Sequence, residues 1–342
     1  MRRGYGSPYE SLPDARSGLR LPERVLLNDV TLREGVQAAQ RPLGQVEKVE
    51  IARQLDTVGI PQIQVGYVGR SASDREGLRA MRDEGVRAVL EGICPLSAPT
   101  WREELETAIR AAADRLNLIL PSSDIRLQQS LKLSRDQMLA RAVEGVGFAR
   151  AYCPRISFSP VDTTRTDLSF LKEVLAAVAE AGADRFYLID TAGVISPLGM
   201  GYLTRAIREV SPIQLAIHCH DDFGLAVANG LVAIEQGAEV VDVCVNGMGK
   251  RAGNLALEEI ALALSVFHNL DLGIRVDGLY ALSHKVAEMT GVDIPFNKAV
   301  VGQDAFDVQV DVQLRGTPGH PAIHALDPAI VGHPAAISHS TG

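Results

Sequence analysis

The chain shows two hydrophobic patterns from Val25 onward. Short apolar runs predict buried strands, and longer segments with apolar residues three and four positions apart predict amphipathic helices. Several of the longer segments end at a glycine, as at Gly59, Gly85 and Gly237, which is a common residue just after a helix. The short runs predict strands at residues 25–29, 60–66, 86–91, 115–120, 155–159, 185–189, 213–219 and 240–245.

A predicted helix follows each predicted strand. The helices are expected at residues 43–58, 72–84, 101–113, 135–152, 167–181, 198–210, 224–236 and 255–264. Eight strand–helix units in about 240 residues match the size of a TIM barrel, the closed (β/α)8 fold of the α/β class. An open, doubly wound sheet is the alternative, but no glycine-rich phosphate motif follows the first strand. The pattern therefore predicts a TIM barrel.

The regions outside this alternation divide the chain into four expected parts. Residues 1–22 are rich in Arg, Gly, Ser and Pro and lack an apolar segment, so we expect a flexible tail and not a secretory signal. Residues 23–269 form the predicted barrel domain. Beyond it the pattern changes to one helix at 276–290 and an irregular remainder, so 270–333 is expected to be a small C-terminal subdomain. Residues 334–342 are expected to form a second flexible tail.

Composition narrows the class of protein. Of the 342 residues, 46% are hydrophobic and 22% are charged, which is enough apolar material for a sizeable core. A net charge of −8 without a basic stripe argues against nucleic-acid binding. No apolar run approaches the roughly 20 residues of a membrane span, so no membrane association is expected. Four scattered cysteines without a CxxC pair fit reduced thiols, so a cytoplasmic location is expected.

Candidate chemistry begins at His218-Cys219-His220, which ends the seventh predicted strand. Residues two apart in a strand point to the same side, so both imidazoles are expected to lie on one side of the strand. Two neutral imidazoles at a strand end are half of a divalent-metal site. The pair alone is weak support, because histidine pairs also occur in ordinary cores and loops.

Two further side chains are expected at the same rim, because active-site groups of a TIM barrel gather at the C-terminal ends of its strands. Asp29 ends the first predicted strand, and Asn254 follows the eighth. One carboxylate, two imidazoles and an amide oxygen suit Mg²⁺, Mn²⁺, Co²⁺ or Zn²⁺ with positions left open for a chelating substrate. Taken singly, Asp29 is equally explained as a helix cap or salt-bridge partner, and Asn254 as a helix N-cap.

Three motifs together resemble the signature of the DRE-TIM metallolyases. They are Asp29 with Arg33-Glu34, the His218-x-His220 pair, and the Gly-x-Gly-x-Arg-Ala-Gly-Asn run that ends at Asn254. This superfamily includes isopropylmalate, homocitrate and citramalate synthases and hydroxymethylglutaryl-CoA lyase. The resemblance covers about residues 25–333, including Asp190-Thr191 and the segment 295–302. The lyase has a catalytic cysteine in the glycine-rich loop, whereas residues 247–251 have none, so the condensing branch fits better; Cys244 is expected to be a small core residue.

The resemblance implies a reaction and its participants. A 2-oxo acid would chelate the divalent metal, and Arg33 would help to stabilise the alkoxide formed when an acetyl-CoA enolate attacks the ketone. Thr191 would hydrogen-bond the carboxylate of the oxo acid, and Gln37 is placed with the substrate-binding residues. Glu34 is expected to orient its neighbours, or simply to form a salt bridge at the rim. A homodimer is also expected.

Several positions depart from the pattern of the synthases. Their usual acidic or histidine side chains are replaced at Gln64, Asn117, Val161 and Gln313. Glutamine does not relay protons as histidine does, so Asp311, His320 and His324 are candidates for the missing base. Three interpretations therefore stay open: a condensing synthase, a metal-dependent aldolase or lyase that cleaves a hydroxy acid with or without CoA, and a catalytically weakened binding or regulatory protein.

Overall fold

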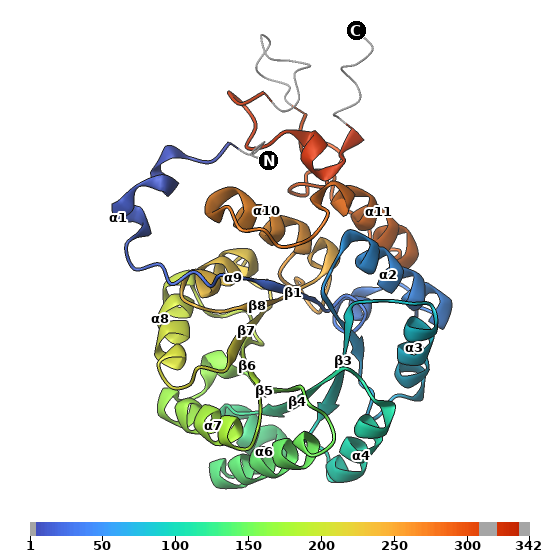
Figure 1. The fold of residues 1–342 in the computed structure, drawn as a ribbon, viewed down its shortest axis with the longest axis vertical. Helices are drawn as coiled ribbons and strands as arrows, with labels where there is room; N and C mark the ends of the chain where they lie inside the picture. The colour runs from blue at the N-terminus through green and yellow to red at the C-terminus, as the bar shows by residue number, and fades with distance from the viewer. Residues whose placement is uncertain (1–4, 308–319, 335–342) are drawn as a thin grey trace.

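The computed structural model describes residues 5–307 and 320–334. Within them, parallel strands pair in chain order and β1 also pairs with β8, which closes the barrel seen in Figure 1. The strands are β1 (Leu26–Asp29), β2 (Gln62–Gly66), β3 (Val89–Pro95), β4 (Arg115–Pro121), β5 (Ile156–Val161), β6 (Arg185–Asp190), β7 (Gln214–Cys219) and β8 (Val240–Val243). The TIM-barrel prediction is confirmed.

Helices form a ring around the strands in Figure 1. The main ones are α2 (Gln45–Val58), α3 (Ala72–Asp83), α4 (Trp101–Ala111), α6 (Arg135–Arg150), α7 (Leu168–Glu180), α8 (Pro197–Arg208), α9 (Ala226–Glu235), α10 (Leu257–His268) and α11 (Leu279–Thr290). Their starts follow local capping chemistry: Ser134 and Gln137 form a capping box at α6, and Asp167 accepts the Phe170 N–H at α7. Gly59 ends α2 with a φ of 93°.

Short helical turns lie between these elements. Those before the barrel are η1 (Pro8–Ser11) and α1 (Pro13–Arg16), within the segment expected to be a flexible tail. Backbone hydrogen bonds join this segment to the rest of the chain, from Tyr5 to Ala325 and from Arg20 to Glu235, each 2.7 Å long. The other turns are η2 (Gly35–Ala38), α5 (Asp124–Arg126), η3 (Leu127–Leu131), η4 (Thr163–Arg165), η5 (Val245–Gly247), η6 (Val276–Gly278) and η7 (Pro328–Val331).

The third strand lies later in the chain than the sequence predicts. Residues 86–88 were expected to begin it, but the strand runs over Val89–Pro95. The backbone N–H groups of Arg87 and Ala88 donate to the carboxylate of Asp56, at 3.0 and 3.1 Å, and not to a neighbouring strand. The segment before β3 is therefore a turn fixed by a side chain of α2.

The inside of the barrel carries an unusual layer of buried polar residues. Glu91 on β3 is fully buried and accepts hydrogen bonds from the amides of Asn28, Gln62 and Gln64, at 3.3, 3.0 and 2.6 Å. Arg185 supplies a compensating positive charge 3.9 Å away. Because buried polar groups are costly unless paired, this layer is held in one arrangement. It forms a fixed floor beneath the rim of the barrel.

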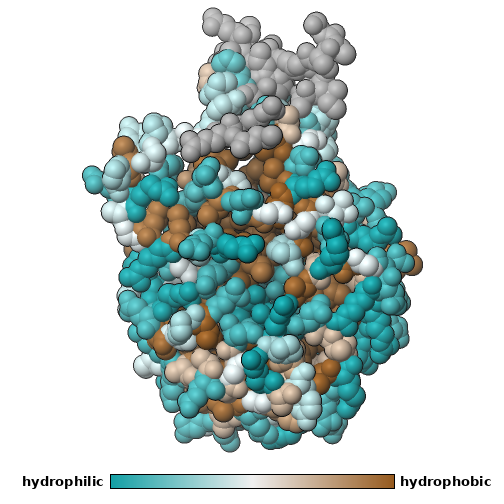
Figure 2. Space-filling model, viewed as in Figure 1, coloured by the Kyte–Doolittle hydropathy of each residue, from teal (hydrophilic) through white to brown (hydrophobic). Residues whose placement is uncertain are grey.

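The C-terminal part packs on the same side of the molecule as α10. Leu279, Leu282 and Val286 of α11 belong to the main core of the barrel. Phe306 and Val331 form a smaller core with Leu262 of α10. Figure 2 shows apolar residues on this upper part of the molecule, where a cavity of about 970 Å³ lies between α10 and the N-terminal segment. No helix among the described residues is long and apolar enough to span a membrane.

Candidate active site

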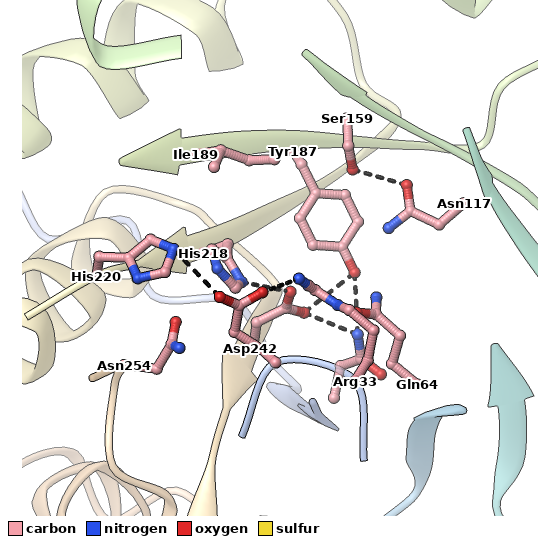
Figure 3. A network of polar contacts seen from close by, with 12 residues as sticks. Arg33, Gln64, Asn117, Ser159, Tyr187, Ile189, His218, His220, Asp242 and Asn254 are labelled. Carbon is pink, nitrogen blue, oxygen red and sulfur yellow. Dashed lines mark hydrogen bonds and ion pairs between the residues drawn. The ribbon is translucent and has the colours of Figure 1, made fainter. Parts of the chain in front are cut away.

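Residues from β1, β7 and β8 meet at the C-terminal rim of the barrel. His218 lies in β7 and His220 just after it, and their ring centroids are 5.2 Å apart. His220 also forms an isolated bridge with Asn254, which brings the loop after β8 against β7. Figure 3 shows these three side chains grouped together, with Arg33 on the other side of Asp242. The alternation expected for the histidine pair is therefore what places both rings at one site.

Each histidine is oriented through its Nδ1 atom. His218 Nδ1 lies 2.9 Å from the carboxylate of Asp242, and His220 Nδ1 lies 3.3 Å from the carbonyl oxygen of Gly253. A carbonyl only accepts hydrogen bonds, so the proton of neutral His220 belongs on Nδ1 and its Nε2 has a free lone pair. Burial, together with the charge of His218, lowers the pKa of His220 to about 3. Metal-binding histidines are typically held in this way.

Glu34 provides the carboxylate that faces the histidines. Its Oε1 lies 3.8 Å from His220 Nε2 and has no hydrogen-bond partner among the described residues, while its Oε2 contacts Arg33. Burial raises the pKa of Glu34, but the charge of Arg33, with smaller effects from His218 and Lys250, outweighs burial and lowers it. Glu34 is therefore ionised and directed at the histidine pair.

Asp29 is placed differently from what the sequence suggests for a metal ligand. Both of its oxygens accept hydrogen bonds from Thr31, one from the backbone N–H at 2.9 Å and one from the hydroxyl at 3.0 Å. Burial raises the pKa of Asp29 to about 7 against these hydrogen bonds. The carboxylate thus fixes the turn after β1, and its role as a metal ligand stays a prediction.

Glycines allow Asn254 to enter the site. A Cβ atom on Gly249 would lie 2.1 Å from the Asn254 side-chain nitrogen, and one on Gly253 would lie 2.1 Å from the carbonyl of Gly247. Gly253 also has a φ of 106°, which favours glycine. The buried Oδ1 of Asn254 has no hydrogen-bond partner among the described residues. An unpaired buried acceptor beside two imidazoles fits a cation ligand.

The donor set as a whole suits a divalent cation. It comprises two imidazole Nε2 atoms, one ionised carboxylate and one amide oxygen, a mixed nitrogen and oxygen set. Within residues 5–307 and 320–334, no three His, Cys, Asp or Glu side chains already lie close enough to hold a metal. Metal–ligand bonds of about 2.0–2.2 Å would need Glu34 and His220 to close part of their separation.

Arg33 is fixed from below and faces the pocket. Its Nε donates to the side-chain oxygen of Gln64, whose amide donates to Glu91 at 2.6 Å. Arg33 lines a cavity of about 200 Å³ together with Glu34, both histidines and Thr191. Gln64, at a position where the synthases usually have an acid, therefore connects Arg33 to the polar layer inside the barrel (Figure 3).

The other predicted substrate-binding residues divide into two cases. The Thr191 Oγ1 accepts the backbone N–H of Asp162 at 2.8 Å, so its own proton is free to be donated into the cavity. Gln37 instead donates to the carbonyl of Arg33 at 2.9 Å and does not line the cavity. The structure thus brings Thr191 together with Arg33 but keeps Gln37 outside.

The candidate bases are not brought to this cavity. His324 lies against the carbonyl of Phe306, 3.2 Å away, and neither His320 nor His324 lines the cavity. Asp311 and Gln313 lie outside the described residues. Val161 lines the cavity, and Asn117 accepts a hydrogen bond from Ser159 at 2.7 Å.

Three cationic residues at the cavity were missed from the sequence, namely Arg126, Lys250 and Arg251. Arg126, in the short helix α5, lines the cavity with a buried Nε that has no hydrogen-bond partner among the described residues. Lys250 lies 3.3 Å from Glu34 Oε1. The sequence signal that could have found them is their position shortly after the C-terminal ends of β4 and β8, where the active-site residues of a TIM barrel gather.

A closed (β/α)8 barrel with two histidines, a carboxylate and an arginine at its C-terminal rim defines an enzyme of the DRE-TIM metallolyase class. A family model described as HMGL-like matches residues 24–286. The chain belongs to the HMGL-like family, which confirms the resemblance seen in the sequence.

Named relatives agree with this membership, and a solved structure shows the same fold. Homocitrate synthase AksA of Methanopyrus kandleri is 37% identical over 327 residues, covering 95% of this chain and 81% of the relative. A probable 2-isopropylmalate synthase of the same organism is 40% identical over 296 residues, covering 86% of this chain and 58% of the relative. Hydroxymethylglutaryl-CoA lyase from Pseudomonas aeruginosa has the same fold, with a TM-score of 0.71 at 22% identity over 80% of this chain and 95% of that chain.

Proposed function

We propose that this protein is an acyltransferase that condenses acetyl-CoA, or a related acyl-CoA, with a 2-oxo acid to give a 2-hydroxy diacid. The observation that carries the proposal is that Arg33, Thr191 and the Glu34–His218–His220 group line one and the same cavity. The names of the relatives, homocitrate and isopropylmalate synthases, support the same reaction class.

The metal site of this proposal uses Glu34 in place of Asp29. His218, His220 and Glu34 would hold a divalent cation, with Asn254 as a fourth contributor. Among the described residues, Glu34 Oε1 and Asn254 Oδ1 accept no hydrogen bond, whereas both oxygens of Asp29 accept hydrogen bonds from Thr31. Mg²⁺, Mn²⁺, Co²⁺ and Zn²⁺ are all compatible with this set. When bound, such a cation supplies Lewis-acid polarisation of a ketone oxygen.

The protein's own groups complete the chemistry. Arg33, held by Gln64 and Glu34, presents a fixed positive charge where the ketone oxygen becomes negative. The Thr191 hydroxyl, which accepts the Asp162 N–H, donates a hydrogen bond to the carboxylate of the oxo acid. Both groups are held in place before substrate arrives, so little reorganisation is needed during the reaction.

The position of Arg126 indicates that the oxo acid has a second anionic group. Asp162 has no exposed surface and is already paired with Arg165 at 2.8 Å, whereas Arg126 lies 3.7 Å from its other oxygen. Two guanidinium groups around one carboxylate leave a surplus positive charge at the cavity. A distal carboxylate or similar anion on the substrate would neutralise it. We therefore propose an oxo acid with two acidic ends; with the carboxylate that the acetyl group contributes, its product would be a 2-hydroxy triacid, whereas a monocarboxylic oxo acid would give the diacid.

The test is CoA release from acetyl-CoA by metal-reconstituted protein, with and without chelator. The oxo acids are pyruvate, 2-oxoisovalerate, oxaloacetate and 2-oxoglutarate. Release that requires both metal and an oxo acid supports the condensation, and preference for the two diacids supports the role of Arg126. Arg126→Met should then lose this preference, whereas Arg165→Met, its neighbour at Asp162, should not. Release without an oxo acid would indicate thioester hydrolysis alone and contradict the proposal.

A second candidate is cleavage of a hydroxy acid by the same site. It is favoured by the replacement of an acidic side chain with Val161 and by the position of His324 away from the cavity. If no oxo acid releases CoA, production of a carbonyl compound from 2-hydroxy diacids or from 4-hydroxy-2-oxo acids distinguishes this candidate. One equivalent of bound metal without either reaction would indicate a binding or regulatory protein.

We further propose that the protein is a cytoplasmic homodimer. The apolar residues around α10 and the cavity beside them support an interface there. Sedimentation equilibrium at several protein concentrations tests it, and a mass near that of one 36.7 kDa chain at all of them would contradict it.

A further inference from the structure

One oxygen of Glu34 has two neighbours that compete for it. Oε1 lies 3.3 Å from the ammonium of Lys250 and 3.8 Å from Nε2 of His220. The Glu34 side chain is 1% exposed, whereas that of Lys250 is 47% exposed. A buried carboxylate is thus paired with a cation that can move into solvent.

The loop that carries Lys250 is held firmly, so only its side chain is free to move. The Gly253 N–H donates to the carbonyl of Lys250 at 3.0 Å, and the Asn254 N–H donates to that of Gly247 at 2.8 Å. The next residue, Arg251, is occupied by both oxygens of Asp222, each 2.7 Å away, and by the carbonyl of Thr191. Arg251 is therefore not available to replace Lys250 beside Glu34.

A divalent cation bound between Glu34 Oε1 and His220 Nε2 would share this oxygen with the Lys250 ammonium. Positive charges on either side of one buried oxygen repel each other, and solvent around the half-exposed Lys250 screens this repulsion only in part. The side chain of Lys250 has the length and the exposure to move away. Metal binding and the Lys250–Glu34 contact should therefore exclude each other.

We propose that Lys250 is a built-in second counter-ion of Glu34, beside Arg33, in the metal-free protein and is displaced from Glu34 Oε1 when the metal binds. It stabilises the empty site and, for the same reason, weakens metal binding. The released ammonium then adds a positive charge at the mouth of the cavity. This inference rests on Glu34 being a metal ligand, as in the proposed function.

The test is the Kd for Mn²⁺ of metal-stripped protein, measured by calorimetry or by the electron spin resonance of free Mn²⁺. Lys250→Met should bind Mn²⁺ about three- to tenfold more tightly than the wild type, which is the size of effect expected from a partly exposed ion pair. Lys250→Arg should stay close to the wild type because it keeps the competing charge. Lys285→Met is the matched control, since Lys285 is 41% exposed and pairs with Glu288 on α11, away from the cavity.

A second measurement separates competition from a general structural effect. The melting temperature of metal-free Lys250→Met should fall, because buried Glu34 loses a counter-charge, whereas the melting temperature at saturating Mn²⁺ should match that of the wild type. Unchanged or weaker Mn²⁺ binding by Lys250→Met would overturn the inference, as would an equal loss of melting temperature with and without metal.

His220→Ala keeps this failure distinct from failure of the proposed function. If the wild type and His220→Ala bind Mn²⁺ equally, the metal site itself is wrong. If His220→Ala loses binding but Lys250→Met binds as the wild type does, the metal site stands and only the counter-ion role of Lys250 is refuted.

Discussion

The carboxylate of Asp242 lies 2.9 Å from Nδ1 of His218, inside the barrel and below the rim. Its other oxygen receives the side-chain amide of Asn28 at 2.7 Å and the hydroxyl of Tyr187 at 3.2 Å. The orientation of one histidine at the site is therefore set by strand residues inside the barrel, and not by a loop (Figure 3).

Asp242→Asn should weaken metal binding by roughly 10- to 100-fold, because the amide no longer draws a proton to Nδ1 and no longer fixes the ring as a carboxylate does. Calorimetric titration with Mn²⁺ or Zn²⁺ measures the change. Tyr187→Phe removes another hydrogen bond to Asp242 without touching His218, so it serves as the matched variant and should have a smaller effect. Equal affinities for Asp242→Asn and the wild type would show that the ring needs no such partner.

Glu34→Gln should lower the affinity for a divalent metal by at least about 100-fold, since it removes the charged oxygen that faces His220. Asp29→Asn should change the affinity much less, because both Asp29 oxygens are bonded to Thr31. Metal content after dialysis, measured by atomic absorption, compares the two variants. Loss of metal from Asp29→Asn with retention in Glu34→Gln would return Asp29 to the role first expected for it.

Arg33→Ala should keep metal binding but raise the barrier of the condensation by about 3 kcal/mol, since a fixed charge at a developing alkoxide typically contributes this much. The comparison is kcat for the preferred oxo acid, with metal content measured on the same sample. Arg33→Lys keeps a charge but not the bond to Gln64, so intermediate activity is expected. Wild-type kcat in Arg33→Ala would remove this residue from the mechanism.

Glu258, at the start of α10, should make stability depend on pH. Burial raises its pKa in the folded state from 4.5 to about 7, although Lys298 opposes this; Glu259 adds to the rise. Between pH 4.5 and about 7, the folded state therefore keeps a proton on Glu258 that the unfolded state loses. The stabilisation that this difference gives is complete below pH 4.5 and is lost as the pH rises through about 7. The free energy of unfolding should fall by up to about 3 kcal/mol over this window.

Urea denaturation between pH 5 and pH 8 measures this effect, and Glu258→Gln should have a flatter profile than the wild type. Glu239→Gln is a control, because Glu239 pairs with Arg208 at the other end of the barrel strands and lies partly exposed. A fall of the same size in Glu258→Gln would assign the pH dependence to other groups.

The sequence predicted the fold because a barrel repeats one strand–helix unit eight times, and strands and helices each have their own spacing of hydrophobic residues. The boundary of β3 was wrong because a side chain, Asp56, captures the backbone N–H groups at which the strand was expected to begin. Such a contact joins residues about thirty positions apart and leaves no local pattern. Family membership was predicted because its motifs are short and keep their spacing.

The site was predicted only in part, for a geometric reason. In a strand, alternation fixes the side to which His218 and His220 point, so their meeting follows from the sequence. Asp29 ends β1 and Glu34 follows it, and only the turn between them decides which carboxylate reaches the histidines. In that turn the Glu34 N–H donates to the carbonyl of Val30 at 2.7 Å, which folds Glu34 back over the rim. Arg126 likewise depends on the short helix α5, for which no periodic signal exists.

The polar layer inside the barrel has a consequence for engineering and for evolution. The amide of Asn28 lies 2.7 Å from Asp242, which orients His218, and 3.3 Å from Glu91, which holds Arg33 through Gln64. The histidines that would bind the metal and the arginine beside them are thus positioned by the same buried polar layer, which is the foundation of the rim. Loops at the mouth can be exchanged to suit a new oxo acid while this foundation is kept. A transplanted rim without these strand interiors would lose the alignment of the histidines and of the arginine together.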